Sequence, residues 1–449
     1  MLPVVPELVP PGSNPRGRPP VARRRVGPES SRRPTPPRSL SRPGGLLWAL
    51  LLAAGLLPTT LAQAQLGTNS FLWRTNFPSA PGVSYKSSAE GVAVDGDGNR
   101  FIVGQSSAAW TSFGSVTFTN LNPLIPGRSD AFVAKVDADG SVLWARQLGG
   151  EGYDTCGRVG VDALGNCYIL GSFESVARFG NTTLTSDGAM DLFLAKYNPV
   201  GTLQWVRQVG GAGVQVAGGI AVDPAGSCYV TGSSDGGVRL GVTQLPGSPG
   251  RAAFVARYSS GGILQWTAMT SVADVTNGVT SRGIAIDGQG NSFITGSFRG
   301  PAIFGSIPLE AVGPDSADLF LAKLSPSGAF LWARAGGGLG EDSGNAVVVD
   351  PSGYCLVAGS TAGGAFGGFA ATVVAGQDAL LAKYSADGSP LWVRTLGGTN
   401  IDTATALAVD ASGNAFLAGT FQGWFRTLGG PQVLGSGPTD SFLARFDRS

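Results

Sequence analysis

The stretch Gly219-Ile-Ala-Val-Asp-Pro-Ala-Gly-Ser-Cys-Tyr-Val-Thr-Gly-Ser233 decides the fold of this chain. Its two ends alternate in the two-residue period of β-strands, and the residues between them have turn composition. Gly226 supplies a backbone that tolerates positive φ, while the carboxylate of Asp223 can hold the following amides. The stretch therefore predicts a β-hairpin.

The same hairpin recurs along the chain, each time around an Asp. The turn Asp residues are Asp95, Asp162, Asp223, Asp287, Asp350 and Asp410. A second hairpin follows in every repeat, as in the run Asp191–Tyr197 and the strand that carries Trp205. Its counterparts begin at Asp130, Arg251, Asp318, Asp378 and Asp440. Four strands in a repeat of this length are typical of one blade of a β-propeller.

A Trp marks the last strand of each repeat and predicts how the ring closes. The series is Trp73, Trp144, Trp205, Trp266, Trp332 and Trp392, and we interpret it as core packing. The sixth Phe-Leu-Ala strand, at 440–445, has no Trp after it, whereas Phe71-Leu-Trp-Arg74 stands before the first repeat. We therefore expect an all-β, six-bladed β-propeller of four-stranded antiparallel blades, the last blade being closed by this N-terminal strand.

These units resemble the SBBP repeat, a bacterial β-propeller repeat family. The resemblance rests on Gly-Asn-x-Tyr-x-x-Gly, on Asp-x-Phe-Leu-Ala-Lys and on a Gly-Gly step, and it covers about residues 71–449. The third unit departs most, with Arg251 in place of Asp and no Gly-Gly after Trp266. The resemblance implies an exported bacterial protein with a scaffold or binding role.

The N-terminal residues have the composition of an export signal. Residues 1–44 are rich in Pro and Arg, an apolar run occupies 46–57, and a small-x-small site ends at Ala64. We expect residues 1–64 to be a basic leader plus signal peptide cleaved after Ala64, and residues 65–449 to be the propeller. An uncleaved membrane anchor is the alternative. The predicted location is secreted, periplasmic or at the bacterial cell surface, with no transmembrane span after cleavage.

Composition limits the chemistry that this chain can perform. Without residues 1–64, 22 basic and 28 acidic residues remain, a net charge of 22 − 28 = −6, which disfavours nucleic acid as a partner. The chain has no His, which excludes His-based nucleophilic catalysis and His-ligated metal sites. The four Cys residues are expected to be buried free thiols, with Cys156 opposite Phe173 in its hairpin.

No catalytic residues are predicted, and two weaker candidates for binding remain. Asp95, Asp97 and Asn99 have the oxygen spacing that begins a calcium loop, but the later Glu is absent, so a plain Asx turn is the alternative. No cofactor is expected apart from calcium at that position. Trp110 and Trp424 stand outside the repeated Trp series and in equivalent loops, where they could form an exposed stacking surface or pack under their own loops.

We therefore expect an exported, non-catalytic binding or structural scaffold that recognises an unknown protein or polysaccharide of the cell envelope. A calcium-dependent hydrolase or lactonase, which some six-bladed propellers resemble, is the alternative. The inner strands offer chiefly Ala, Val and Gly, which disfavours that enzyme.

Overall fold

Each repeated turn is held by the side chain of its Asp. In this computed structural model, which describes residues 87–108, 110–120, 128–313, 315–427, 430 and 432–448, Oδ1 of Asp287 accepts hydrogen bonds from the backbone N–H of Gln289 (3.0 Å) and of Asn291 (2.9 Å). Gly290 follows with a φ of +80°, which glycine adopts without strain. The predicted Asx turns therefore join the first two strands of every unit.

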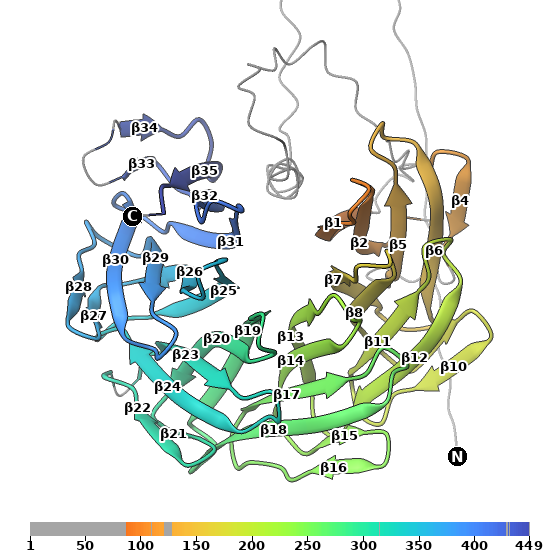
Figure 1. The fold of residues 1–449 in the computed structure, drawn as a ribbon, viewed down its shortest axis with the longest axis horizontal. Coiled ribbons are helices and arrows are strands. Elements are labelled where there is room, and N and C mark those ends of the chain that lie inside the picture. The colour runs from red at the N-terminus through yellow and green to blue at the C-terminus, as the bar shows by residue number, and fades with distance from the viewer. Residues whose placement is uncertain are drawn as a thin grey trace, which may run out of the picture. The chain divides into compact units, whose positions relative to one another are not determined.

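The described residues form 35 β-strands, which fall into repeated antiparallel units (Figure 1). The first unit contains β1 (Ser87–Val94), β2 (Arg100–Ser106), β5 (Asp130–Val136) and β6 (Val142–Gly150). The second contains β7 (Thr155–Val161), β8 (Cys167–Phe173), β11 (Asp191–Tyr197) and β12 (Leu203–Gly210). The third contains β13 (Gln215–Val222), β14 (Cys228–Ser234), β17 (Ala252–Tyr258) and β18 (Leu264–Val272).

The later units repeat this order. The fourth contains β19 (Gly278–Ile286), β20 (Ser292–Arg299), β23 (Asp318–Leu324) and β24 (Phe330–Gly336). The fifth contains β25 (Ser343–Val349), β26 (Cys355–Thr361), β29 (Asp378–Tyr384) and β30 (Pro390–Gly397). The sixth contains β31 (Thr403–Val409), β32 (Ala415–Phe421) and β35 (Asp440–Phe446). Figure 1 shows the first strand of each unit on the side that faces the other units.

Every unit also carries a short hairpin that the sequence analysis missed. The hairpin strands are β3 (Trp110–Phe113) with β4 (Val116–Thr119), β9 (Val176–Phe179) with β10 (Thr182–Thr185), β15 (Val238–Leu240) with β16 (Thr243–Leu245), β21 (Pro301–Phe304) with β22 (Ile307–Glu310), β27 (Gly364–Phe366) with β28 (Phe369–Ala371), and β33 (Trp424–Thr427) with β34 (Gln432–Leu434). Four strands per repeat was therefore an undercount.

Most of these hairpins leave their own unit and extend the sheet of the preceding one. For example, β9 of the second unit pairs with β6 of the first, and β33 of the sixth pairs with β30 of the fifth. The hairpin β3–β4 forms a two-stranded sheet of its own among the described strands. The hairpins thus join each sheet to the next.

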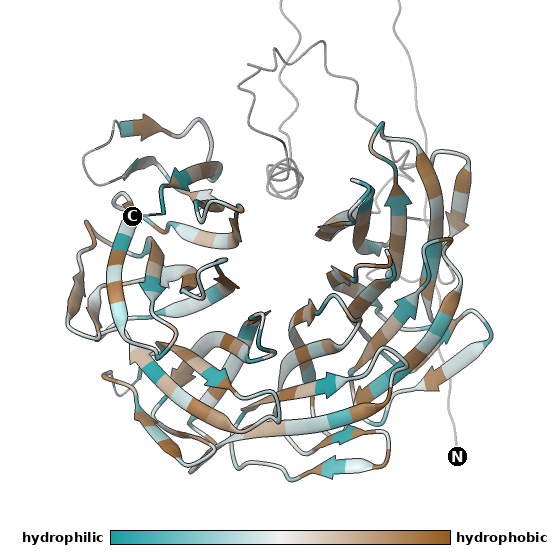
Figure 2. Cartoon of the chain, in the orientation of Figure 1, coloured by the Kyte–Doolittle hydropathy of each residue, from teal (hydrophilic) through white to brown (hydrophobic). Residues whose placement is uncertain are grey.

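The hydrophobic core lies between neighbouring units. One cluster combines Phe101 and Trp144 of the first unit with Ile169 and Phe193 of the second, all at most 6% exposed. Figure 2 shows brown and teal segments alternating along the strands, as expected where one side of a strand is buried. The five described Trp residues of the repeated series all belong to such clusters or pack against them. Trp73 lies outside the described residues.

An indole N–H also donates a hydrogen bond to the following unit from Trp144, Trp205, Trp266 and Trp332. Nε1 of Trp144 donates to the carbonyl of Pro199 at 3.0 Å, and Nε of Arg146 donates to the carbonyl of Gly201 at 2.8 Å. A Cβ on Gly201 would lie 2.6 Å from the Trp144 ring, so only glycine fits beneath it. The repeated Trp-x-Arg segment therefore binds the second hairpin of the next unit, and we call this contact the Trp clasp.

A β-bulge interrupts the first strand of every unit, and the sequence analysis did not foresee it. The unpaired residues are Glu90, Gly157, Gly218, Arg282, Asn345 and Thr405. The bulge shifts the register, so Cys156 pairs with Gly171 and the expected pairing with Phe173 is wrong. All four Cys residues are buried free thiols, as expected.

Two predictions fall outside the described residues. The leader with its apolar run and cleavage site lies in 1–64, and the closing strand lies at 71–74; neither is described. Within the described part of the chain, no helix has the length and apolar character needed to cross a membrane.

Candidate binding site

The bulged first strands line one cavity of about 410 Å³. Each of the six units contributes the bulge residue or its neighbours, from β1, β7, β13, β19, β25 and β31. A bulge turns a side chain away from the regular pleat, and bulges are common beside functional sites. The bulge has the same place in every unit, but its side chain differs. The cavity wall is therefore a place where the backbone repeats and the side chains do not.

Two arginines on this wall have no carboxylate partner. Arg158 donates from Nε to the carbonyl of Gly218 (2.6 Å) and from Nη1 to the carbonyl of Gly157 (3.1 Å). Arg282 donates from Nη1 to Oδ1 of Asn345 at 3.1 Å. Among the described residues, neither arginine has an ion pair within 4.0 Å.

Both guanidinium groups lose part of their solvation at the cavity wall, Arg158 as a half-buried side chain and Arg282 as an exposed one. Burial lowers the pKa of Arg158, and the charge of Glu90 opposes that shift. Burial likewise lowers the pKa of Arg282, opposed by the charge of Glu341. Both groups stay protonated, since arginine titrates far above neutral pH, so the wall holds two partly desolvated cations.

The remaining polar side chains of the wall are held by local hydrogen bonds. Oε1 of Glu90 accepts from Oγ of Ser88 at 2.7 Å. Nδ2 of Asn345 donates to the carbonyl of Ala404 at 2.9 Å, so its Oδ1 is directed at Arg282. These bonds fix Asn345 as a support for the Arg282 side chain.

The structure places Trp110 and Trp424 at equivalent points of the fold. Trp110 is the first residue of β3, and Trp424 is the first residue of β33. Trp424 is half-buried, and a Cβ on Gly398 would lie 3.1 Å from its ring. The shared stacking surface proposed from the sequence stays a prediction.

The candidate calcium loop is a turn whose charge is already balanced. Both carboxylate oxygens of Asp95 accept from Nδ2 of Asn99 (3.0 and 2.9 Å), and Nζ of Lys135 lies 3.1 Å from Oδ2. Although burial raises the pKa of Asp95, the hydrogen bonds from Asn99 and Lys135 hold it below its usual value. These contacts favour the Asx turn over a calcium loop at Asp95, Asp97 and Asn99.

Paired carboxyl groups are buried where one unit meets the next. Asp318 and Asp342, both at most 1% exposed, face each other across Gly337, and Oδ1 of Asp318 has no hydrogen-bond partner. Asp130 with Asp154, and Asp378 with Asp402, repeat the arrangement across Gly149 and Gly397.

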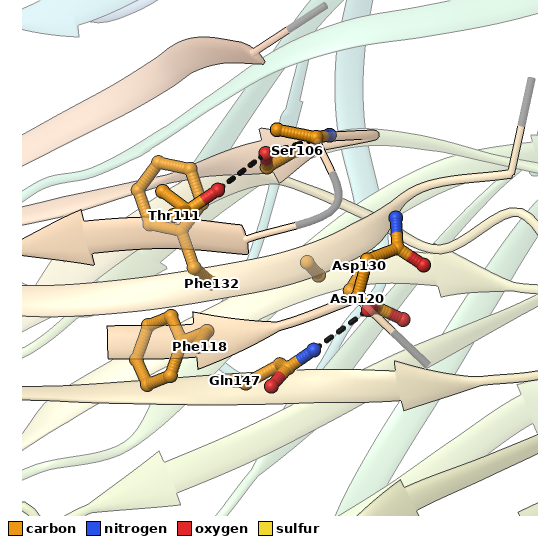
Figure 3. A pocket seen from close by; sticks show the side chains of 9 residues that line it. Ser106, Thr111, Phe118, Asn120, Asp130, Phe132 and Gln147 are labelled. Carbon is orange, nitrogen blue, oxygen red and sulfur yellow. Dashed lines mark hydrogen bonds between the residues drawn. The ribbon is translucent and has the colours of Figure 1, made fainter. Parts of the chain in front are cut away.

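Burial governs the protonation of these pairs. Burial, assisted by the charge of Asp130, raises the pKa of Asp154 to about 7. Figure 3 shows the small pocket beside that pair, where Nε2 of Gln147 donates to Oδ2 of Asp130 at 2.6 Å. Among the described residues, no group of three or more Asp, Glu or Cys side chains is placed to hold a metal ion. Burial likewise raises the pKa of Asp342 and of Asp378 to about 6.

The sequence analysis missed the polar wall because it considered only the small residues nearer the turn. The signal was present five residues before each turn Asp, where Glu90, Gly157, Gly218, Arg282, Asn345 and Thr405 follow no common type. Arg158 gives a second signal, since the other units have Gly or Ala at its position.

The comparisons with known proteins agree with the repeat. Residues 143–172 and 204–237 match the model of the SBBP family, described as a beta-propeller repeat. The chain is 26% identical over 355 residues to the regulatory protein FlaEY of Caulobacter vibrioides, covering 72% of this chain and 35% of that protein. It is 22% identical over 242 residues to an uncharacterized WD repeat-containing protein of Acanthamoeba polyphaga mimivirus, covering 46% of this chain and 17% of that protein. The chain thus spans about a third or less of these relatives.

Two of the solved structures that match this chain have low sequence identity and low TM-scores. A protein of unknown function from Dyadobacter fermentans matches with a TM-score of 0.38 and 11% identity, over 80% of this chain and 94% of that chain. Another of unknown function, from Bacteroides caccae, matches with a TM-score of 0.34 and 12% identity, over 64% of this chain and 78% of that chain. These matches carry no conclusion about ligand or activity.

Proposed function

We propose that this chain, which carries SBBP beta-propeller repeats, is an exported, non-catalytic binding module of the bacterial cell envelope. The observation that supports this proposal best is the variation at the bulge. Residues that hold units together recur from unit to unit, whereas the cavity wall carries Glu, Arg, Asn and Thr at one repeated position. A wall that is rigid in backbone and variable in side chain suits recognition of one ligand.

The fold that we propose for this module is a closed six-bladed propeller. The outer side of β35 and the hairpin β3–β4 both lack the neighbouring strand that equivalent elements have among the described strands. In the other units that position belongs to the Trp strand, such as β6, which pairs with its own unit and with the next hairpin. Residues 71–74 carry the remaining Trp, so one strand would complete both sheets.

The expected ligand is a protein or a polysaccharide of the envelope. We test this by retention of the full chain on arrays of envelope polymers and glycans. The matched variant carries glycine at the four non-glycine bulge positions (Glu90→Gly, Arg282→Gly, Asn345→Gly and Thr405→Gly), as in the second and third units. Because these side chains line the cavity and not the core, we expect ligand retention to be lost while the fold survives.

Two further outcomes would change the proposal. If the glycine variant retains the ligand and the double variant Trp110→Ala, Trp424→Ala does not, the stacking surface is the binding site. A melting temperature raised by several degrees with calcium and lowered by chelator, together with hydrolysis of a lactone, would replace the binding module by the hydrolase alternative.

A further inference from the structure

We infer that the cavity binds an anionic group, such as the carboxylate of an acidic sugar, at Arg282 and Arg158. This inference rests on the proposed function and names the chemistry of its ligand. It begins from the unpaired charge of the two guanidinium groups.

Arg282 is the primary anchor because most of its donors have no partner among the residues that the structure describes. A guanidinium has five N–H groups in a planar fork, and Arg282 is recorded with one hydrogen bond, from Nη1 to Asn345. Its side chain is exposed to the cavity, while its bulge position holds the backbone in β19. The fork is therefore oriented and available for a carboxylate, which arginine binds through two parallel hydrogen bonds.

Arg158 contributes a second positive charge from another unit. Its guanidinium lies at the bulge of β13, where the carbonyl of Gly218 accepts a hydrogen bond from its Nε at 2.6 Å. Two of its nitrogens donate to backbone carbonyls, and Nη2 has no recorded acceptor. Because burial makes both cations more costly than in water, an anion in the cavity offsets that cost.

The one acidic side chain of the wall does not cancel these charges. Glu90 lies on β1 and is held by Ser88, and it has no ion pair with either arginine. The described lining therefore carries two cations against one carboxylate, and Glu341, whose charge also acts on Arg282, lies outside the lining and is paired with Arg299. Residues 65–449 as a whole carry a net charge of 22 − 28 = −6. Anions that the surface repels in general would be favoured at this wall.

The test measures the melting temperature of the full chain against sodium glucuronate, inorganic phosphate, glucose and sodium chloride at equal ionic strength. We expect a saturable rise with glucuronate, phosphate or both, and none with glucose or chloride. A rise with glucuronate alone indicates carboxylate recognition, and a rise with phosphate alone indicates phosphate recognition. The absence of any saturable rise above that of chloride would overturn the inference.

Variants locate the site on the wall. Arg282→Gln should weaken the apparent affinity at least tenfold, and Arg158→Gln should weaken it less, because two of its donors are already used. Arg282→Lys keeps the charge without the fork and should lie between wild type and Arg282→Gln. Arg239→Gln is the matched control, because it removes an arginine on β15 that does not line the cavity, and it should change the affinity less than twofold. Equal affinity of wild type and Arg282→Gln would refute the assignment.

The same experiment separates this inference from the proposed function. If an envelope polymer is retained by wild type but not by the glycine variant, and Arg282→Gln retains it fully, the cavity binds a ligand that is not anionic. If glucuronate or phosphate binds through Arg282 and no polymer is retained, the anion site stands and the module is not an envelope receptor.

Discussion

The junction between the fourth and fifth units contains a pair of buried carboxyl groups around a glycine. The junction between the third and fourth units lacks this pair. The former holds Asp318 and Asp342 on either side of Gly337. The latter has Ala252 and Val279 at the equivalent positions, and Ser271 where the glycine would be.

The register that pairs Ala252 with Ser234 shows that the sequence-based alignment of Arg251 with the repeated Asp is wrong by one residue. Arg251 pairs with Asp235 (2.6 Å), and Val279 is fully buried. The glycine thus accompanies the first of the two carboxyl groups, since Gly210 is kept beside Asp191 even where Gln215 replaces the second.

This difference explains the departure of the third unit from the repeat. A Cβ on Gly337 would lie 2.6 Å from Oδ1 of Asp318 and 2.6 Å from Oδ2 of Asp342. Where neither carboxyl group is present, that space is not needed and Ser271 is exposed. The Gly-Gly step of the family pattern is therefore a consequence of the buried acids at the junction.

The two junctions share the Trp clasp, and its loss should have the largest effect. Trp332→Ala should lower the free energy of unfolding by about 3–5 kcal/mol, because it removes a buried ring of the fourth unit that contacts the fifth and leaves a cavity. Trp266→Ala should cost somewhat less, since Trp266 is only partly buried, although its indole also donates to the next unit (2.8 Å). Urea unfolding followed by circular dichroism measures both. A negligible cost in either variant would show that the clasp does not hold that junction.

The glycine at the junction gives the next largest effect. Gly337→Ala should cost on the order of 2–3 kcal/mol, because the added methyl group overpacks a buried site between two carboxyl groups. Ser271→Ala is the matched control at the carboxyl-free junction and should stay within about 0.5 kcal/mol, as exposed substitutions usually do. Equal costs would mean that the acids are not the reason for the glycine.

The carboxyl junctions should also make stability depend on pH. The pKa of Asp154 is raised from 3.8 to about 7, chiefly by burial, so the folded protein binds this proton more tightly than the unfolded chain. Its contribution to stability is complete below the unfolded pKa and is lost as the pH rises through the folded pKa. Between these pH values, wild type should lose on the order of 1–3 kcal/mol relative to Asp154→Asn, which stays neutral.

Urea titrations of wild type and Asp154→Asn across this range measure that difference. Gln215 occupies the Asp154 position in the third unit, so one junction already carries a neutral side chain there. A parallel pH dependence of wild type and Asp154→Asn would contradict the raised pKa.

The elements that recur in every unit could be predicted from the sequence. The elements that vary between units, or whose position depends on the pairing register of the strands, were missed. The Asx turns, the strands around them and the core role of the Trp series follow from local patterns that repeat many times. The short hairpins were missed because strands such as β15, Val238–Leu240, are too short for an alternating pattern. A repeated Phe-Gly could have revealed several of them, as at Phe179-Gly180, where Gly180 has a φ of +58°.

The cavity wall was harder to predict than the blades. A bulge adds one residue to a strand without changing its composition, so Arg282 and its neighbour Gly283 read as regular strand. Which of these two side chains faces the cavity depends on that register. The variation of the bulge residue from unit to unit was visible in the sequence. Its link to a binding site could be recognised only from the structure, in which all six first strands line one cavity.

The smallest expected effect concerns the ion pair between Arg251 and Asp235, which lies beside the junction without buried acids. Arg251 and Asp235 contact each other through two hydrogen bonds, but their side chains are 34% and 44% exposed. Water and salt screen such a pair, so Asp235→Asn should cost only about 0–1 kcal/mol, and less at high salt. Thermal melts at low and high ionic strength measure this. A cost above that of Gly337→Ala would show that Arg251 carries the junction as the buried acids do, and the contrast between the two junctions would fail.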